Sequence, residues 1–268
     1  MPRLLGMMVA LLACCGMFAA LATSAASAQE ETATLHTSFT PDKLGASTTI
    51  GFDFEVRTVD GLAPPPLTGM DLHMPAGMGY INTTLGLALC SRSTLEAKGG
   101  GACPTNSVLG TGSAFVEVPF GKGAGHELPT ITAYMGPPNK GNMVILFYVN
   151  GRTPVYGQFI FNGEVLPQAG IFGSQLNAAV PLVKSVPNGP DVSIVRGETN
   201  IGPEHLVYYR KNKGRREKFK PRGIAVPEKC PAGGFPFVAE FSFQDGSTAE
   251  AEDIVPCPKP TPKKKSKK

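Results

Sequence analysis

The stretch FPFVAEFSFQDG, residues 235 to 246, decides the fold class of this chain. Its four phenylalanines and Ala239 alternate with residues that are mostly polar or small. At a period of two, the rings share one face of an extended strand, while Glu240, Ser242 and Gln244 lie on the other. Asp245-Gly246 is a strong signal for a tight hairpin turn, and residues 247 to 255 are the expected returning strand. The stretch therefore predicts a half-buried antiparallel hairpin.

Strand patterns recur along the rest of the chain. Residues 49 to 56, TIGFDFEV, are apolar at even positions, whereas residues 143 to 149 are apolar throughout, as in a central strand covered on both faces. We expect further strands at residues 32–39, 48–57, 68–73, 107–118, 130–135, 143–150, 155–161, 175–183, 192–199 and 206–209, and a short helix near 93–98. With Gly and Pro scattered between them, these strands predict an all-β fold, an antiparallel β-sandwich that is jelly-roll-like or Ig-like.

The first 28 residues have the features of a secretory signal peptide. Arg3 supplies a positive charge, residues 4 to 21 are apolar, and Ala26-Ser27-Ala28 offers the small residues that signal peptidase accepts. A membrane anchor and a lipoprotein signal ending at Cys14 are the alternatives. No later segment approaches the length of about 18 apolar residues that a transmembrane helix needs. The sequence therefore predicts a protein that is secreted or associated with the cell envelope.

Four cysteines lie outside the signal segment. Their even number in an exported chain favours disulfides, and we expect the pairs Cys90 with Cys103 and Cys230 with Cys257, each the nearest in sequence. Closing such short loops stabilises a fold by roughly 3 kcal/mol each in the chain-entropy model. A zinc site is the alternative, but the chain has no C-x-x-C and no His at ligand spacing. We therefore expect no metal or other cofactor.

The chain from residue 29 to residue 257 reads as one β-sandwich domain. No low-complexity linker interrupts it, and a division near residues 187 to 190 is the two-domain alternative. Residues 258 to 268 are rich in Lys and Pro and predict a disordered cationic tail.

Basic residues are concentrated in two places. Of the 25 Lys and Arg, eight lie between Arg210 and Arg222 and six between Lys259 and Lys268, whereas only Glu217 of the 21 acidic residues falls in these segments. The body is therefore acidic although the whole chain has a net charge of +4. The first segment predicts a basic hairpin that turns at Asn212-Lys213-Gly214, because Asn and Gly tolerate the positive φ of a tight turn.

Clustered cations attract anionic polymers and surfaces through summed Coulomb attraction and counterion release. We expect the partner to be an anionic cell-wall polymer or a membrane surface, with no specific nucleic acid. There are two alternatives to polyanion binding: the hairpin is solvated and only neutralises the acidic body, and the tail only keeps the protein soluble. The aromatic residues Tyr208, Tyr209 and Phe219 either belong to the core or stack on bases or sugars of a ligand. The candidate polyanion-binding residues are Arg210, Lys211, Lys213, Arg215, Arg216, Lys218, Lys220, Arg222, Lys263, Lys264 and Lys265.

Signatures of known enzymes are incomplete in this sequence. His126-Glu127-Leu128-Pro129-Thr130 begins like the zinc motif H-E-x-x-H but ends on Thr130, and Gly110-Thr111-Gly112-Ser113 lacks the third glycine of a phosphate loop. The four histidines are dispersed. Asp53 and Glu55 share one strand face, which leaves a secreted hydrolase or carbohydrate-binding protein as the alternative. We name no catalytic residue and favour a non-enzymatic protein.

Two blocks of the sequence resemble a group of exported actinobacterial proteins. The first is C-S at 90–91, C-P at 103–104 and S-V-L-G-T-G at 107–112; the second is K-G-R-R at 213–216, C-P at 230–231 and F-S-F-Q-D-G at 241–246. The resemblance implies export, two disulfides and a β-rich body. It implies no activity, because the group has no established chemistry.

Overall fold

Antiparallel strands make up most of the structure, a computed structural model that describes residues 31–80, 85–120, 123–202, 206–221 and 223–258. The all-β fold class is confirmed, as is a short helix, α1 (Arg92–Lys98). The strands of the large sheet are β1 (Glu31–Thr40), β2 (Ser47–Thr58), β3 (Leu67–Pro75), β4 (Gly79–Tyr80), β5 (Val108–Phe120), β6 (Gly123–Glu127), β7 (Thr130–Met135), β8 (Met143–Gly151), β9 (Gly157–Pro167), β10 (Phe172–Ala179), β11 (Ser193–Ile201), β14 (Ile224–Ala225), β15 (Phe235–Phe243) and β16 (Thr248–Val255). A separate two-stranded sheet consists of β12 (Tyr208–Asn212) and β13 (Arg215–Phe219).

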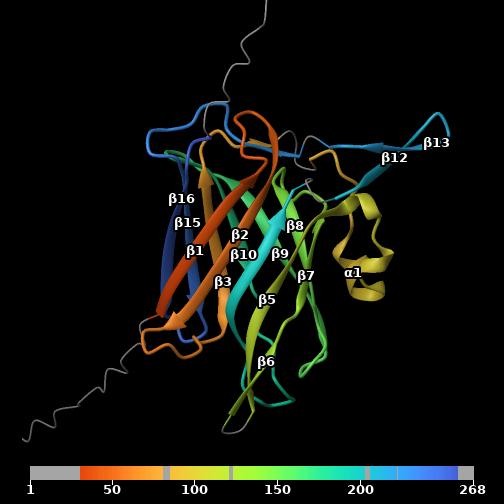
Figure 1. Cartoon of the computed structure of the whole chain (residues 1–268). Coiled ribbons are helices and arrows are strands. Elements are labelled where there is room, and N and C mark those ends of the chain that lie inside the picture. Colours follow the sequence, from red (N-terminus) through yellow and green to blue (C-terminus); the bar gives the residue numbers. More distant parts are fainter. Residues whose placement is uncertain (1–30, 81–84, 121–122, 203–205, 222, 259–268) are drawn as a thin grey trace, which may run out of the picture.

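The large sheet curves until it is nearly closed (Figure 1). The expected two layers are thus two packed halves of one continuous sheet. At the seam, β1 lies beside β16, where the main-chain N–H and the hydroxyl of Thr37 both donate to Asp253 Oδ2, at 2.5 and 2.8 Å. Side-chain hydrogen bonds thus complete the ring where strand pairing ends.

Strands from distant parts of the sequence are neighbours in this sheet. The C-terminal hairpin β15–β16 pairs with β3, with Phe241 opposite Met70, and β11 lies between β2 and β5. The segment around Pro187 to Pro190 connects β10 and β11, two strands of the same sheet.

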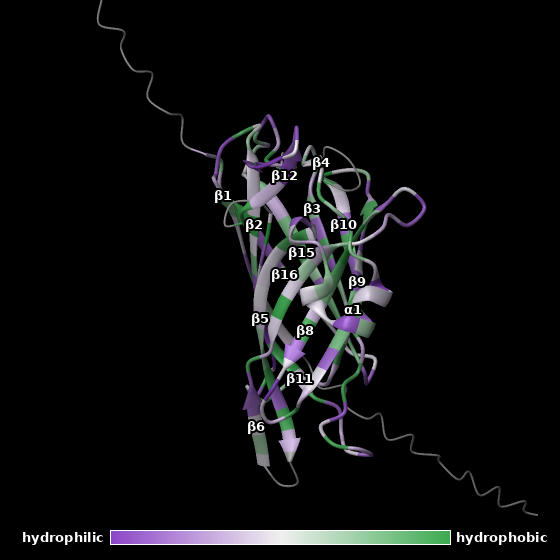
Figure 2. Ribbon diagram, turned by 90° about the vertical axis from the view of Figure 1, so that its right-hand side faces the viewer, coloured by the Kyte–Doolittle hydropathy of each residue, from purple (hydrophilic) through white to green (hydrophobic). Residues whose placement is uncertain are grey.

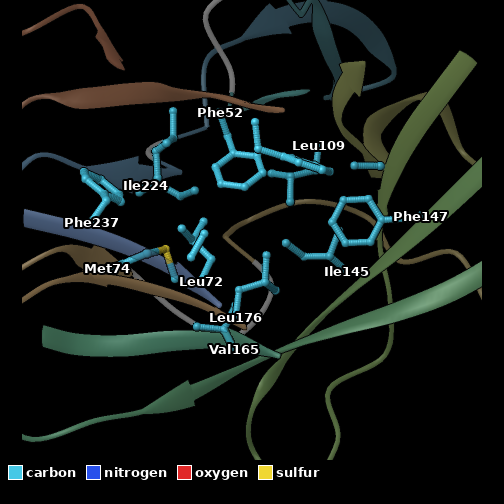
Figure 3. Close-up of a cluster of buried hydrophobic side chains, with 14 of the residues drawn as sticks. Phe52, Leu72, Met74, Leu109, Ile145, Phe147, Val165, Leu176, Ile224 and Phe237 are labelled. Carbon is cyan, nitrogen blue, oxygen red and sulfur yellow. The ribbon is translucent and has the colours of Figure 1, made fainter. Parts of the chain in front are cut away.

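The inner face of the sheet forms the main hydrophobic core. Phe235, Phe237 and Phe241 have no exposed surface, and the Phe241 ring packs 5.0 Å from that of Phe54 on β2. Burying each such side chain contributes roughly 1.5 to 3 kcal/mol. Figure 3 shows side chains from opposite parts of the sheet, among them Phe52 and Phe147, pointing into one shared interior.

A smaller cluster explains why β8 is buried on both faces. Its odd-numbered residues face the main core, whereas Val144, Leu146 and Tyr148 pack under α1. The helix begins where Ser91 Oγ accepts a hydrogen bond from the Thr94 N–H, a standard N-cap, and its only buried residue, Leu95, joins this cluster. Residues 90 to 107 thus cover the outer side of β8.

Both expected disulfides are present. Cys90 bonds Cys103 beside α1, and Cys230 bonds Cys257 at the open end of the β15–β16 hairpin. Disulfides are typical of proteins that fold in an oxidising compartment. Within the described ranges, no helix has the length and apolar character that crossing a membrane requires.

Most strand boundaries differ from the sequence prediction by a few residues, and two of the differences have a clear cause. The strand expected from residue 175 to 183 ends at Ala179, because Pro181 has no N–H to donate to a ladder. The strand expected from Val155 begins at Gly157, since the N–H of Val155 donates to Glu127 Oε2 at 3.2 Å.

Candidate functional site

The predicted basic hairpin is formed by β12 and β13, which project from one end of the molecule (Figure 1). Figure 2 shows hydrophilic residues along β12. Lys213 and Gly214 make the turn with φ of 48° and 79°. The expectation that Asn212 takes a positive φ is wrong: Asn212 ends β12, and its side-chain amide donates to Glu217 Oε2 at 3.2 Å. The tight turn itself is confirmed, but it consists of Lys213 and Gly214 and does not include Asn212.

Hydrogen bonds fix the base of the hairpin to β5 and to the turn before it. The hydroxyl of Tyr208 donates to the carbonyl oxygen of Val108 at 2.9 Å. The side chain of Asn106 accepts from the N–H of Tyr209 at 3.1 Å and donates to the carbonyl oxygen of Tyr209. Burial of the Tyr208 ring raises the pKa of its hydroxyl. The hairpin therefore has a rigid attachment to the body.

The ladder register gives the hairpin two faces of different charge. On one face Arg210 lies opposite Glu217, and Arg210 Nε donates to Glu217 Oε1 at 2.6 Å. This hydrogen bond is the main reason why the pKa of the Glu217 carboxyl is lowered. One cation of this face is thereby neutralised.

The other face carries no carboxylate. Lys211 lies directly opposite Arg216, and Tyr209 lies opposite Lys218. The guanidinium of Arg216 sits 3.8 Å from the centre of the Tyr209 ring, a cation–π contact. Lys211 and Lys218 are exposed, and neither has an ion pair among the described residues. We call Lys211, Arg216 and Lys218 the cationic face.

The aromatic residues of the hairpin offer little surface to a ligand. Tyr208 is buried, and its ring packs 5.9 Å from that of Phe219, so stacking of Tyr208 on a base or sugar is excluded. Tyr209 is half-buried and covered by Arg216. A ligand of this hairpin would therefore contact charged side chains rather than aromatic rings.

Six of the predicted polyanion-binding residues lie together on the hairpin, and the others lie beyond it or outside the described residues. Arg210, Lys211, Lys213, Arg215, Arg216 and Lys218 lie on the hairpin, and Lys220 follows β13. Outside the described residues lie Arg222, Lys263, Lys264, Lys265 and the proposed signal peptide. Sequence reasoning missed Asn106, because no local pattern links it to a strand that begins about a hundred residues later.

Carboxylates also gather on the outer face of β2, β5 and β11, where two arginines lie between them. Arg196 contacts Asp53 at 2.9 Å and Glu198 at 3.4 Å. Arg57 contacts Glu55 at 2.6 Å and Glu117 at 3.9 Å. These carboxylates are therefore held as ion pairs.

The remaining polar residues singled out in the sequence have structural contacts. Glu127 is buried and accepts from the N–H of Arg152 at 2.6 Å, which fixes the β8–β9 turn. His126 stacks on Phe115 with ring centres 5.0 Å apart, and His73 Nδ1 lies 2.9 Å from Gln168 Oε1. Over the described ranges, no group of three or more His, Cys, Asp or Glu is arranged to hold a metal ion. Gly110 and Gly112 lie within β5, in a strand and not in a phosphate loop.

Comparison with known proteins adds no relative. No protein-family model, curated protein or solved structure matches this chain.

Proposed function

We propose that this chain is an exported, non-enzymatic β-protein that associates with the cell envelope, or with another extracellular polyanion, through its basic hairpin and Lys-rich tail. The two disulfides support export, because such bonds persist in oxidising environments. The proposed signal peptide and the six lysines between residues 259 and 268 enter the proposal from the sequence alone.

The observation that carries the proposal is the cationic face. Lys211 and Arg216 lie directly opposite each other, and like charges in this arrangement destabilise a strand pair. No carboxylate on this face offsets the repulsion. An anionic polymer or surface lying across the face relieves the repulsion between the two side chains. The proposed partner is recognised by charge, since the rings beside it are buried or covered.

A wash of the envelope of an expressing bacterium with low and then high salt tests the association in place. Electrostatic attachment predicts release at high salt, because salt screens exposed charges. Free recovery of the protein in the medium before any wash contradicts the proposal and favours a diffusible binder or enzyme.

Binding of the purified chain to beads coated with long-chain polyphosphate assigns the attachment to residues. The hairpin variant Lys211→Gln with Lys218→Gln removes two charges, and a second variant lacks residues 259 to 268. The matched control, Lys43→Gln with Lys98→Gln, removes two exposed charges from the body. We expect the hairpin variant to elute at lower salt, with a salt slope shallower by about one for each phosphate group that no longer binds a lysine, as for nucleic acids. The control should elute with the unmodified chain. Equal elution of all variants contradicts the proposal.

A further inference from the structure

A cleft of about 300 Å³ lies on the outer face of β2, β5 and β11. In Figure 1, β11 is the cyan strand between β2 and β5. The volume of the cleft reaches the lower end of the range for pockets that bind small molecules, roughly 300 to 1,000 Å³. The side chains that give the cleft its chemical character are Glu55, Arg57, Phe115, Leu128, Arg196 and Glu198.

The charges of the cleft are balanced, and each of them is paired. Arg57 Nε lies 2.6 Å from Glu55 Oε1. Arg196 Nη2 lies 3.4 Å from Glu198 Oε2 and 2.9 Å from Asp53 Oδ2, just outside the lining. A ligand with a charge of its own therefore finds no unpaired opposite charge among the described residues of the lining.

These ion pairs still offer many hydrogen bonds to a ligand. All four side chains of the lining are partly exposed. A guanidinium has five N–H donors, and a carboxylate has about four sites that accept, so one contact to a partner leaves most of them free. A hydroxyl group both donates and accepts, and its hydrogen bonds to ionised groups are roughly twice as strong as those between neutral groups. The cleft is therefore suited to a ligand with several hydroxyl groups.

An apolar wall lies beside the ion pairs. Phe115 is half-buried and lies directly opposite Arg196 in the ladder between β5 and β11. Its ring stacks on His126 with ring centres 5.0 Å apart, which holds it in place. Leu128 follows β6 and is 70% exposed. Because the face of an aromatic ring is negatively polarised, it attracts C–H groups, and this wall therefore fits an apolar face of a ligand.

We propose that this cleft binds a neutral saccharide, with the C–H face of one sugar ring against Phe115 and its hydroxyl groups toward Arg196 and Glu198. A sugar ring has C–H groups on its faces and hydroxyl groups around its rim, so it complements both walls. A purely apolar ligand is disfavoured, because it would cover charged groups without offering them hydrogen bonds. The pairing of each carboxylate with an arginine favours binding over hydrolysis. The lining includes no residue of β12 or β13, so this site is separate from the basic hairpin and its proposed polyanion.

Saturation-transfer difference NMR of the purified chain with neutral sugars tests the proposal. The panel is maltotriose, cellotriose, mannotriose and N-acetylated chitotriose. We expect saturation transfer to at least one member, strongest at the C–H protons of the ring that contacts Phe115. The absence of transfer to all four sugars overturns the proposal.

Charged sugars test whether the ligand is neutral. The monosaccharide unit of the sugar that binds is compared, as a competitor, with its uronic acid and with its 2-amino form, which carry one negative and one positive charge. Both charged forms should compete more weakly than the neutral unit, because each charge in the cleft is already paired. Competition by either charged form that equals or exceeds that of the neutral unit overturns the assignment.

Two variants with matched controls locate the site. Phe115→Ala removes the ring and should weaken binding about tenfold, as the loss of an aromatic stacking partner does for nucleic-acid bases. Phe172→Ala is its control, because Phe172 is also half-buried and also packs beside a histidine, His73, but lies outside the cleft. The control should bind like the unmodified chain, and equal weakening in both variants overturns the proposal.

The second variant, Glu198→Gln, replaces a charged acceptor by a neutral one of the same size and should weaken binding several-fold. Its control is Glu250→Gln, which removes an exposed carboxylate from β16. Circular dichroism checks that each variant is folded, and if Phe115→Ala unfolds, the comparison of Glu198→Gln with Glu250→Gln still decides. Equal affinity of these two for the sugar places the binding elsewhere and overturns the proposal.

Discussion

The hydroxyl of Tyr208 donates a hydrogen bond of 2.9 Å to the main-chain carbonyl oxygen of Val108, and this bond fastens the base of the basic hairpin to β5. Removal of the hydroxyl leaves the Val108 carbonyl oxygen without this donor. We expect Tyr208→Phe to lower the free energy of unfolding by about 1 kcal/mol, the net value of such a bond. Urea unfolding measures this decrease. Tyr156→Phe is the control because Tyr156 is 78% exposed, and an equal decrease in both variants contradicts the assignment.

The same tyrosine makes stability depend on alkaline pH. Burial raises the pKa of Tyr208 above its ordinary value of 10.0, so above that pH the unfolded chain loses a proton that the folded chain retains. The unfolded state then binds fewer protons, and the free energy of unfolding falls as pH rises. Burial also raises the pKa of Tyr134, which contributes in the same direction. Unfolding measured from neutral pH to above pH 10 should show a shallower decline in Tyr208→Phe than in the unmodified chain. Parallel declines contradict the prediction.

Close packing of β5 against β11 makes Gly112 sensitive to substitution. A Cβ at Gly112 would clash with the main-chain oxygen of Glu198, so the paired strands must move apart. We expect Gly112→Ala to destabilise the fold by about 1 to 3 kcal/mol, as overpacked positions do. Gly157→Ala is the control, since a Cβ there meets no atom within 4 Å. Thermal unfolding should separate the two variants.

Repulsion on the cationic face predicts opposite effects on stability and binding. Lys211→Gln removes one of two like charges that lie directly opposite each other, and it should raise the free energy of unfolding by a few tenths of a kcal/mol at low salt. The same variant should bind polyphosphate more weakly. The gain in stability should shrink at high salt, because the charges are exposed. A decrease in stability indicates instead that Lys211 has a structural role.

Local patterns in the sequence predicted most of the secondary structure. The alternation in residues 235 to 243 and 49 to 56 reports which side chains face the core, since side chains of a strand alternate between its two faces. Both disulfides followed from pairing each cysteine with its nearest partner. The short helix was visible as well.

Contacts between distant residues could not be predicted in this way. Nothing near Phe241 in the sequence indicates that β15 pairs with β3, or that the sheet nearly closes on itself. The charge of the hairpin could be seen in the sequence. The hydrogen bond between the Tyr209 N–H and Asn106 could not, because it depends on tertiary structure. The cleft combines residues of β2, β5 and β11, which are neighbours only in the folded sheet.

The seam between Thr37 and Asp253 has a consequence for the order of events during synthesis. Its two residues are 216 positions apart, so the first strand leaves the ribosome long before the last one exists. Until β16 has been synthesised and has folded, one edge of β1 lacks its neighbouring strand. Contacts between residues so far apart in the sequence form slowly. A chain cut short before Thr248 lacks β16 and keeps that edge open to proteases and to other chains. Only a chain that includes β16 can therefore form the seam of its own sheet.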